Sequence, residues 1–309
     1  MLVRVPRAAV TIGLLALAIA AWPIRDGPEV NGDGRLAAAY ALVDRGSADL
    51  DPYVAQWPVL AKDLAIADGR HVLAKPALPT LVIAVPYALA RLALPPARID
   101  DPAWRWALTL AVSGVAFAAC ALLTSRIAAR AGLPARPGAG LVAVMATPLL
   151  VYSAYLFSHV LAAALLAGLV LAATSRGRMP AALTGALAGA SLATETLMAL
   201  AALPPVIYAA ARARRDPVAI GLLVAGGIVA MAPQLGYSWV VFGSPLADAS
   251  ELLADPVARQ AYADPARGSA PPLALAKLLL SPSHGLLLYA PVLVMGAAML
   301  VRRWVGRER

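Results

Sequence analysis

Long uninterrupted apolar runs, separated by shorter polar connections, make up most of this chain. Apolar and polar residues do not alternate within the runs, and a lipid bilayer admits only helices or closed barrels, so each run indicates a helix. We predict membrane-spanning helices over residues 8–24, 103–124, 138–155, 159–174, 181–193, 196–211, 217–241 and 285–301. The predicted fold class is therefore all-α, a polytopic transmembrane helical bundle of about eight to nine spans, with residues 1–309 forming a single integral membrane domain.

A further apolar run, residues 76–94, differs from the others because Pro76, Pro79 and Pro86 interrupt it. Proline removes a backbone hydrogen-bond donor and clashes with the preceding helical turn, which disfavours one straight span. We expect this segment to form a juxtamembrane or re-entrant helix that does not fully cross the bilayer.

Composition strengthens the membrane interpretation. Hydrophobic residues make up 61% of the chain and charged residues only 14%, with a mean hydropathy of +0.74. This is too apolar for an ordinary soluble domain. The net charge of +9 does not indicate a nucleic-acid partner, because most of the arginines lie in short clusters beside apolar runs, where membrane orientation explains them.

These arginine clusters predict the topology, since connections rich in arginine and lysine remain in the cytoplasm. The clusters are Arg4 and Arg7; Arg126, Arg130 and Arg136; Arg176 and Arg178; Arg212, Arg214 and Arg215; and Arg302, Arg303, Arg307 and Arg309. All of them are cytoplasmic, together with both termini, if the chain crosses about eight times and residues 76–94 do not cross. External loops then cover residues 25–75 and 242–284, and Glu195 and the Ser158–His159 pair face the same side.

Asp33 is the first candidate for chemistry in the external loop of residues 25–75. It follows Asn31-Gly32 and precedes an apolar, helix-like run over residues 36–43. A carboxylate at the membrane surface can take the proton of an acceptor hydroxyl group, which is general-base catalysis. The alternative is an ordinary N-cap of that helix, a common role for aspartate.

Lys75 and Glu195 are candidates for substrate binding. Lys75 precedes the proline-rich segment, where its ammonium group can pair with a lipid phosphate or simply extend to the polar interface. Glu195 interrupts an apolar region, and an ionised residue in such a place is by default a functional candidate, the alternative being a solvated turn between two helices.

His159 and His284 are two further candidates for substrate binding. They could bind a divalent cation with loop carboxylates, but no paired-histidine spacing supports a metal site, and we predict no cofactor. Asp49-Leu50-Asp51 has the spacing with which many sugar transferases hold a metal and a nucleotide, but on the external face a solvated turn explains it better. The single cysteine, Cys120, lies in an apolar run and excludes a disulfide framework.

Several short motifs together resemble bacterial membrane glycosyltransferases of the GT-C superfamily, relatives of the protein mannosyltransferases and of the aminoarabinose lipid A transferase. Gly32-Asp33, a short helix and the segment 44–51 are similar to the family's "GDEP, helix, DGDLDL" opening, and segment 75–79 is similar to its KPPGLP. Further matches, in family order, are residues 155–159, 194–196, 242–245, 281–286 and 289–291, the last two resembling SPxRGLxxYxP.

The resemblance implies a transferase that moves a sugar, with inversion, from a polyprenyl-phosphate carrier to a lipid, glycan or protein acceptor at the outer face of the bacterial cytoplasmic membrane. It implies that Asp33 is the base and that Lys75 meets the carrier phosphate. Two departures from the family pattern are Gly34, where the family has an acidic residue, and His284, where it has arginine. They leave two alternatives open: a non-catalytic membrane component of envelope assembly, or a lipid or solute transporter.

Overall fold

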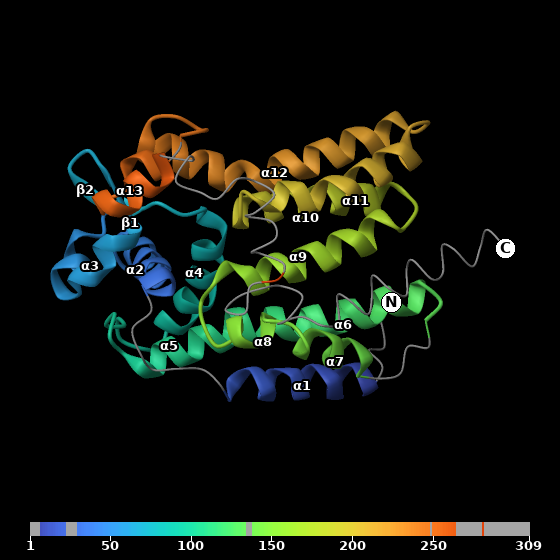
Figure 1. Ribbon diagram of the computed structural model, residues 1–309, viewed down its shortest axis with the longest axis horizontal. Coiled ribbons are helices and arrows are strands. Elements are labelled where there is room, and N and C mark those ends of the chain that lie inside the picture. Colours follow the sequence, from blue (N-terminus) through green and yellow to red (C-terminus); the bar gives the residue numbers. More distant parts are fainter. Residues whose placement is uncertain (1–6, 23–29, 134–137, 248, 264–279, 281–309) are drawn as a thin grey trace.

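The computed structural model describes residues 7–22, 30–133, 138–247, 249–263 and 280. Within these residues the chain is mostly helical, and its only two strands form one short hairpin. The all-α class is therefore confirmed for the described part of the chain. Figure 1 shows a long bundle of helices with a smaller folded region at one end, which contains the hairpin.

The helices of the bundle agree with most of the predicted apolar segments. They are α1 (Arg7–Ala21), α5 (Pro102–Thr109), α6 (Val115–Arg130), α7 (Ala139–Met145), α8 (Leu149–Tyr152), α9 (Ser158–Ala173), α10 (Arg178–Thr194), α11 (Met198–Ala213) and α12 (Pro217–Phe242). A π-helical turn, η2 (Leu110–Gly114), joins α5 to α6 without a break. The predicted helix over residues 285–301 lies outside the described residues.

The single helix predicted over residues 138–155 is wrong, because the chain forms α7 and α8 there, separated by a turn. Pro148 is the cause. It has no N–H with which to continue α7, and it serves instead as the residue before α8. Thr147 stabilises the break, since its hydroxyl donates to the carbonyl oxygen of Val144 at 2.7 Å.

Two helical stretches among the described residues are long and apolar enough to cross a membrane: Pro102–Arg130, with 29 residues, and Pro217–Phe242, with 26. Four shorter apolar helices accompany them: Val10–Ala21, Ala77–Arg91, Ser158–Ala173 and Met198–Ala213. The apolar part of α12 is only 11% buried, against 56% for Pro102–Arg130. A largely uncovered apolar helix of this length is typical of a membrane protein.

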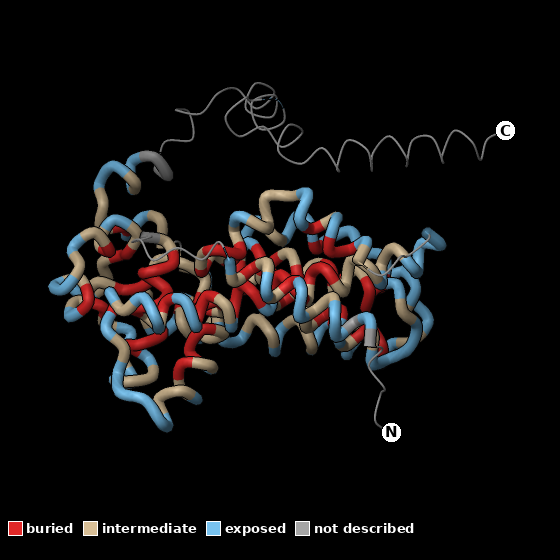
Figure 2. The backbone as a smooth tube through the Cα atoms, turned by 90° about the horizontal axis from the view of Figure 1, so that it is seen from below, coloured by how far each residue is buried: buried red, intermediate tan, exposed pale blue. Residues whose placement is uncertain are grey.

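The external loop predicted over residues 25–75 is a folded unit in its described part, which we call the loop region (residues 30–76). It contains α2 (Val30–Arg45), α3 (Asp51–Gln56), the 3-10 helix η1 (Pro58–Asp63), and the antiparallel strands β1 (Leu64–Ala67) and β2 (Arg70–Leu73). Asp68 and Gly69, both with positive φ, form the hairpin turn, as tight hairpins require. Figure 2 shows buried residues both here and along the middle of the bundle.

The loop region packs on α4 (Ala77–Arg91), the proline-rich segment. Tyr40 of α2 and Tyr87 of α4 are fully buried, with ring centroids 4.4 Å apart. The Tyr87 hydroxyl donates to Asp44 at 2.5 Å. With 15 residues, α4 is about 22 Å long, short for a bilayer core of about 30 Å, and in Figure 1 it runs steeply across the direction of the bundle helices.

The two ends of the bundle differ in charge. The arginines of the described clusters belong to the end away from the hairpin, where α6, α9 and α11 finish and α10 and α12 begin (Figure 1). We call this the arginine end. Ser158, Glu195 and the described residues 243–247 and 249–263 belong to the opposite end, beside the loop region.

Candidate functional site

A cavity of about 500 Å³ lies where the loop region meets the bundle. Six parts of the chain line it. From the loop region come the start of α2, the last residues of η1, and the residues between β2 and α4. From the bundle come the start of α9, the turn after α10, and the end of α12 with the segment that follows. Three of the predicted site residues, Lys75, His159 and Glu195, line this cavity. His284 lies outside the described residues.

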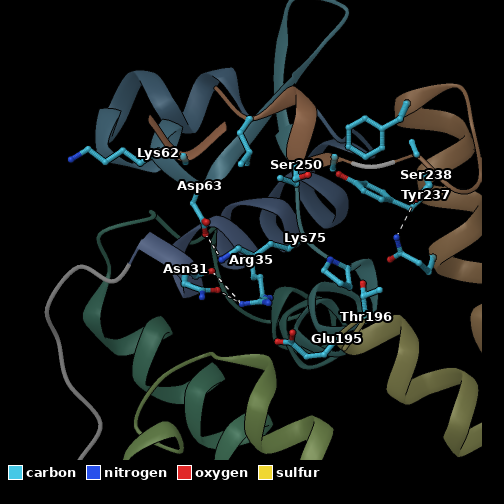
Figure 3. Close-up of a pocket in the computed structure, with 18 of the residues that line it drawn as sticks. Asn31, Arg35, Lys62, Asp63, Lys75, Glu195, Thr196, Tyr237, Ser238 and Ser250 are labelled. Carbon is cyan, nitrogen blue, oxygen red and sulfur yellow. Dashed lines mark hydrogen bonds and ion pairs between the residues drawn. The ribbon is translucent and has the colours of Figure 1, made fainter. Parts of the chain in front are cut away.

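Lys75 is held in the cavity by Asp63. The hairpin explains how they meet, because Leu64 pairs with Leu73 in the antiparallel register, which brings the residue before β1 close to the residues after β2. The Lys75 Nζ atom lies 2.5 Å from the Asp63 Oδ2 atom, and both side chains are partly exposed to the cavity (Figure 3). Asp63 was not among the residues selected from the sequence.

Glu195 is the acceptor in a chain of polar contacts. Arg35, which is 2% exposed, donates from Nη2 to the Ser158 hydroxyl oxygen at 3.0 Å, and this hydroxyl donates to Glu195 Oε1. The His159 Nδ1 atom lies 3.4 Å from the same carboxylate oxygen. Glu195 can accept these contacts because α10 ends at Thr194 and its backbone turns extended at this residue. Its side chain remains 28% exposed.

Asp33 is separated from the cavity. Asn31 and Arg35 are four residues apart on α2 and share the face that lines it, whereas Asp33 lies on another face. Its carboxylate is 1% exposed and forms an ion pair with Arg105 of α5. The N-cap alternative for Asp33 is wrong, because α2 begins at Val30.

Arg105, and Gln234 and Tyr237 of α12, hold this arrangement together, and none of the three was selected from the sequence. The Arg105 guanidinium lies 5.8 Å from the Trp57 ring centroid and donates from Nη2 to the carbonyl oxygen of Ile99. On α12, Gln234 accepts from the Ala77 backbone N–H at 2.6 Å, and Tyr237 donates to the Leu73 carbonyl oxygen at 2.7 Å.

A signal for Arg105 and Gln234 existed in the sequence, since an arginine or glutamine inside an apolar run needs a buried partner. Arg35 and Asp63 carry no such signal, because charged residues are ordinary in a loop.

The Asp49-Leu50-Asp51 segment has a structural role. Asp51 Oδ1 accepts from the backbone N–H of His71 at 3.0 Å and lies 2.7 Å from His71 Nδ1. The backbone hydrogen bond, followed by the contact with the imidazole, holds the pKa of Asp51 below its ordinary value of 3.8. These contacts tie the start of α3 to β2, and Asp51 does not line the cavity.

No group of three or more histidine, cysteine, aspartate or glutamate side chains is placed to hold a metal ion among the residues that the structure covers. In the cavity, Glu195 and His159 lie close together, but they form only a pair of potential metal ligands.

Neither a family model, nor a curated protein, nor a solved structure matches the chain. The resemblance to GT-C glycosyltransferases therefore rests on the motifs alone and remains a prediction. Residues from separate motifs do meet at one place, since Lys75, His159, Glu195, Thr196 and Phe242 all line the same cavity.

Proposed function

We propose that this protein is a membrane glycosyltransferase of GT-C type, which moves a sugar from a polyprenyl-phosphate donor to a lipid, glycan or protein acceptor. The observation that carries the proposal is the meeting of a lysine with two carboxylates, Asp63 and Glu195, in one cavity at the end of an apolar helical bundle. A lipid-linked donor needs the apolar bundle, because its carrier chain belongs in lipid. It also needs the lysine, because its phosphate requires a cation.

The proposed setting is the bacterial cytoplasmic membrane, with both termini in the cytoplasm and the cavity at the external surface. Helices α9 and α10, with 16 and 17 residues, are about 24–26 Å long and can cross with flanking residues. The gathering of arginines at the end away from the cavity supports this orientation. The short α4 would then lie at the external membrane surface, as a juxtamembrane helix.

In the proposed reaction, Lys75 binds the donor phosphate and exchanges its contact with Asp63 for this new one. The acceptor oxygen forms a bond to the anomeric carbon, and the bond from that carbon to the phosphate oxygen breaks. Inversion requires the base and the leaving phosphate on opposite faces of the sugar. Glu195 fits the base, because it lies across the cavity from the Asp63–Lys75 pair (Figure 3), whereas Arg105 closes off Asp33.

Activity of the purified protein with polyprenyl-phosphate sugars tests the proposal. Glu195→Gln should lower kcat roughly 10²–10⁴-fold, the usual contribution of a general base. Lys75→Ala should mainly raise KM for the donor. Lys75→Arg should raise it less, since a phosphate requires a cation and arginine supplies one. Arg70→Ala is the matched control, because Arg70 is an exposed cation of β2 that does not line the cavity. Wild-type activity in Glu195→Gln would refute the assignment of the base.

A second candidate function is a non-catalytic component of envelope assembly that binds a lipid phosphate. The enclosed Asp33 favours it, because the residue that matches the family's base has no route to a substrate in this arrangement. In that case the purified wild type should bind the donor lipid and leave its sugar intact over prolonged incubation, and Lys75→Ala should weaken binding all the same.

The proposed orientation can be tested with single cysteines, because the native Cys120 is buried and gives little background. Ala48→Cys, at an exposed position of the loop region, should react with an impermeant maleimide in intact cells. Met179→Cys, 77% exposed at the start of α10, should react only after the membrane is opened. The reverse pattern would put the cavity in the cytoplasm and remove the external acceptor from the proposal.

A further inference from the structure

A second cavity, of about 440 Å³, lies at the arginine end of the bundle. It is formed by the end of α9, the start of α10, the end of α11 and the start of α12. One wall is made of small apolar side chains: Ala172, Ala173, Ala181, Ala209, Ala213 and Ala219. The polar part contains the charged residues Arg176, Arg212 and Asp216 together with Ser175 and Thr184. The volume is in the range of small-molecule sites.

The polar part carries surplus positive charge. Its acid, Asp216, is already engaged by Arg178, whose Nε lies 3.0 Å from Oδ2, and by the backbone N–H groups of Val218 and Ala219 at the start of α12. Arg212 donates from Nη1 to the Thr174 carbonyl oxygen at 2.9 Å, and a guanidinium has five N–H donors in all. Arg176 is exposed at the rim. The arrangement suits an anion with several oxygen atoms.

Exposed aromatic and apolar side chains lie close in sequence to the lining residues of α11 and α12. Tyr208 of α11, whose ring centroid lies 5.3 Å from the Arg212 guanidinium, is 50% exposed, and Val218 and Leu222 of α12 are 49% and 38% exposed. A free inorganic anion would leave these side chains and the alanine wall uncovered. A ligand that joins a phosphate to an acyl chain would cover both.

We propose that this cavity binds the phosphate headgroup of an anionic phospholipid, with the acyl chains lying along α11 and α12. The inference rests on the membrane orientation of the proposed function, which brings the arginine end to the cytoplasmic leaflet, where anionic lipids concentrate. It does not depend on sugar transfer, because the site is at the opposite end of the helices from Lys75 and Glu195.

Native mass spectrometry of the full-length protein in detergent tests the proposal, with phosphatidylglycerol and phosphatidylcholine of equal chain length as probes. The wild type should retain phosphatidylglycerol in preference to phosphatidylcholine. Arg176→Gln/Arg212→Gln should weaken this binding about 25-fold, because each guanidinium that donates directly to the phosphate contributes roughly a factor of five. Arg214→Gln/Arg215→Gln removes the same charge nearby, outside the residues that line the cavity, and should change binding less than twofold.

In the double variant, loss of the Arg212–Thr174 hydrogen bond could loosen the helix ends and weaken binding indirectly. Arg176→Gln alone keeps this hydrogen bond and should weaken binding about fivefold. Equal retention of both lipids by the wild type, or equal losses in the two double variants, would overturn the proposal. Displacement of phosphatidylglycerol by inorganic phosphate would also overturn it, since that outcome describes an anion site without a place for the lipid chains. An inactive transferase that still binds phosphatidylglycerol selectively would refute only the proposed function.

Discussion

Asp33→Asn should lower the yield and the thermal stability of the folded protein, whatever its effect on catalysis. The substitution removes the charge that compensates Arg105, and both side chains are almost fully buried. Breaking a buried ion pair from one side costs about 3–5 kcal/mol, because the remaining charge stays out of water without a counter-charge. The unfolding temperature in detergent, and the fraction of monodisperse protein after purification, measure the effect.

The matched control is the double variant Asp33→Asn/Arg105→Gln, which removes both charges and leaves two side chains that can hydrogen-bond to each other. It should recover most of the stability lost in Asp33→Asn, and a double-mutant cycle gives the coupling between the two residues. A different result would restore Asp33 as the base: an Asp33→Asn protein as stable as the wild type, but without transferase activity.

Gly226→Ala should separate α10 from α12. A Cβ atom at Gly226 would lie 2.4 Å from the carbonyl oxygen of Ala182 and 3.0 Å from the Ala186 backbone nitrogen, so the two helix backbones would have to move apart. Overpacking of this kind typically costs about 1–3 kcal/mol, and more where backbone atoms are in the way. We expect the unfolding temperature to fall by roughly 5 °C or more.

Gly221→Ala provides the control on the same helix, because a Cβ atom there meets nothing within 4 Å. It should leave the unfolding temperature unchanged or raise it slightly, since alanine favours the helix over glycine. Gly185→Ala, which places a Cβ atom on the Leu223 carbonyl oxygen from the α10 side, should reproduce the Gly226→Ala effect. If Gly221→Ala and Gly226→Ala behave alike, the close approach of the two helices is not what stabilises this part of the bundle.

The helices could be predicted from the sequence because each long apolar run is too continuous for any other structure in lipid. The apolar pattern does not predict the break at Pro148, because apolar residues continue on both sides of this proline. The fold of the loop region was not predictable from this pattern, because its core depends on contacts such as Tyr40 on Tyr87, between residues far apart in the chain.

The same limit applied to the candidate site. Glu195 stood out because an ionised residue that interrupts an apolar region is unusual, and Lys75 and His159 because each stands at the start of an apolar run on the predicted external side. The partner of Lys75 did not, because Asp63 is one of many acids in a polar segment, and only the register of the hairpin selects it. Asp33 is separated from the cavity because it lies on a different face of α2 from Asn31 and Arg35. The sequence did not predict this, because the helix-like run of residues 36–43 does not show that α2 already begins at Val30.

Helix α12 reaches both cavities. Asp216 and Ala219 line one of them, and Gln234, Tyr237 and Ser238 line the other, at opposite ends of a helix about 39 Å long. Through Gln234 and Tyr237 the helix also holds the backbone on either side of Lys75. A shift of α12 along its axis would therefore change the lining of both cavities at once. By thermodynamic linkage, if a lipid at the arginine end alters the affinity for a donor beside Lys75, the donor must alter the affinity for that lipid by the same factor.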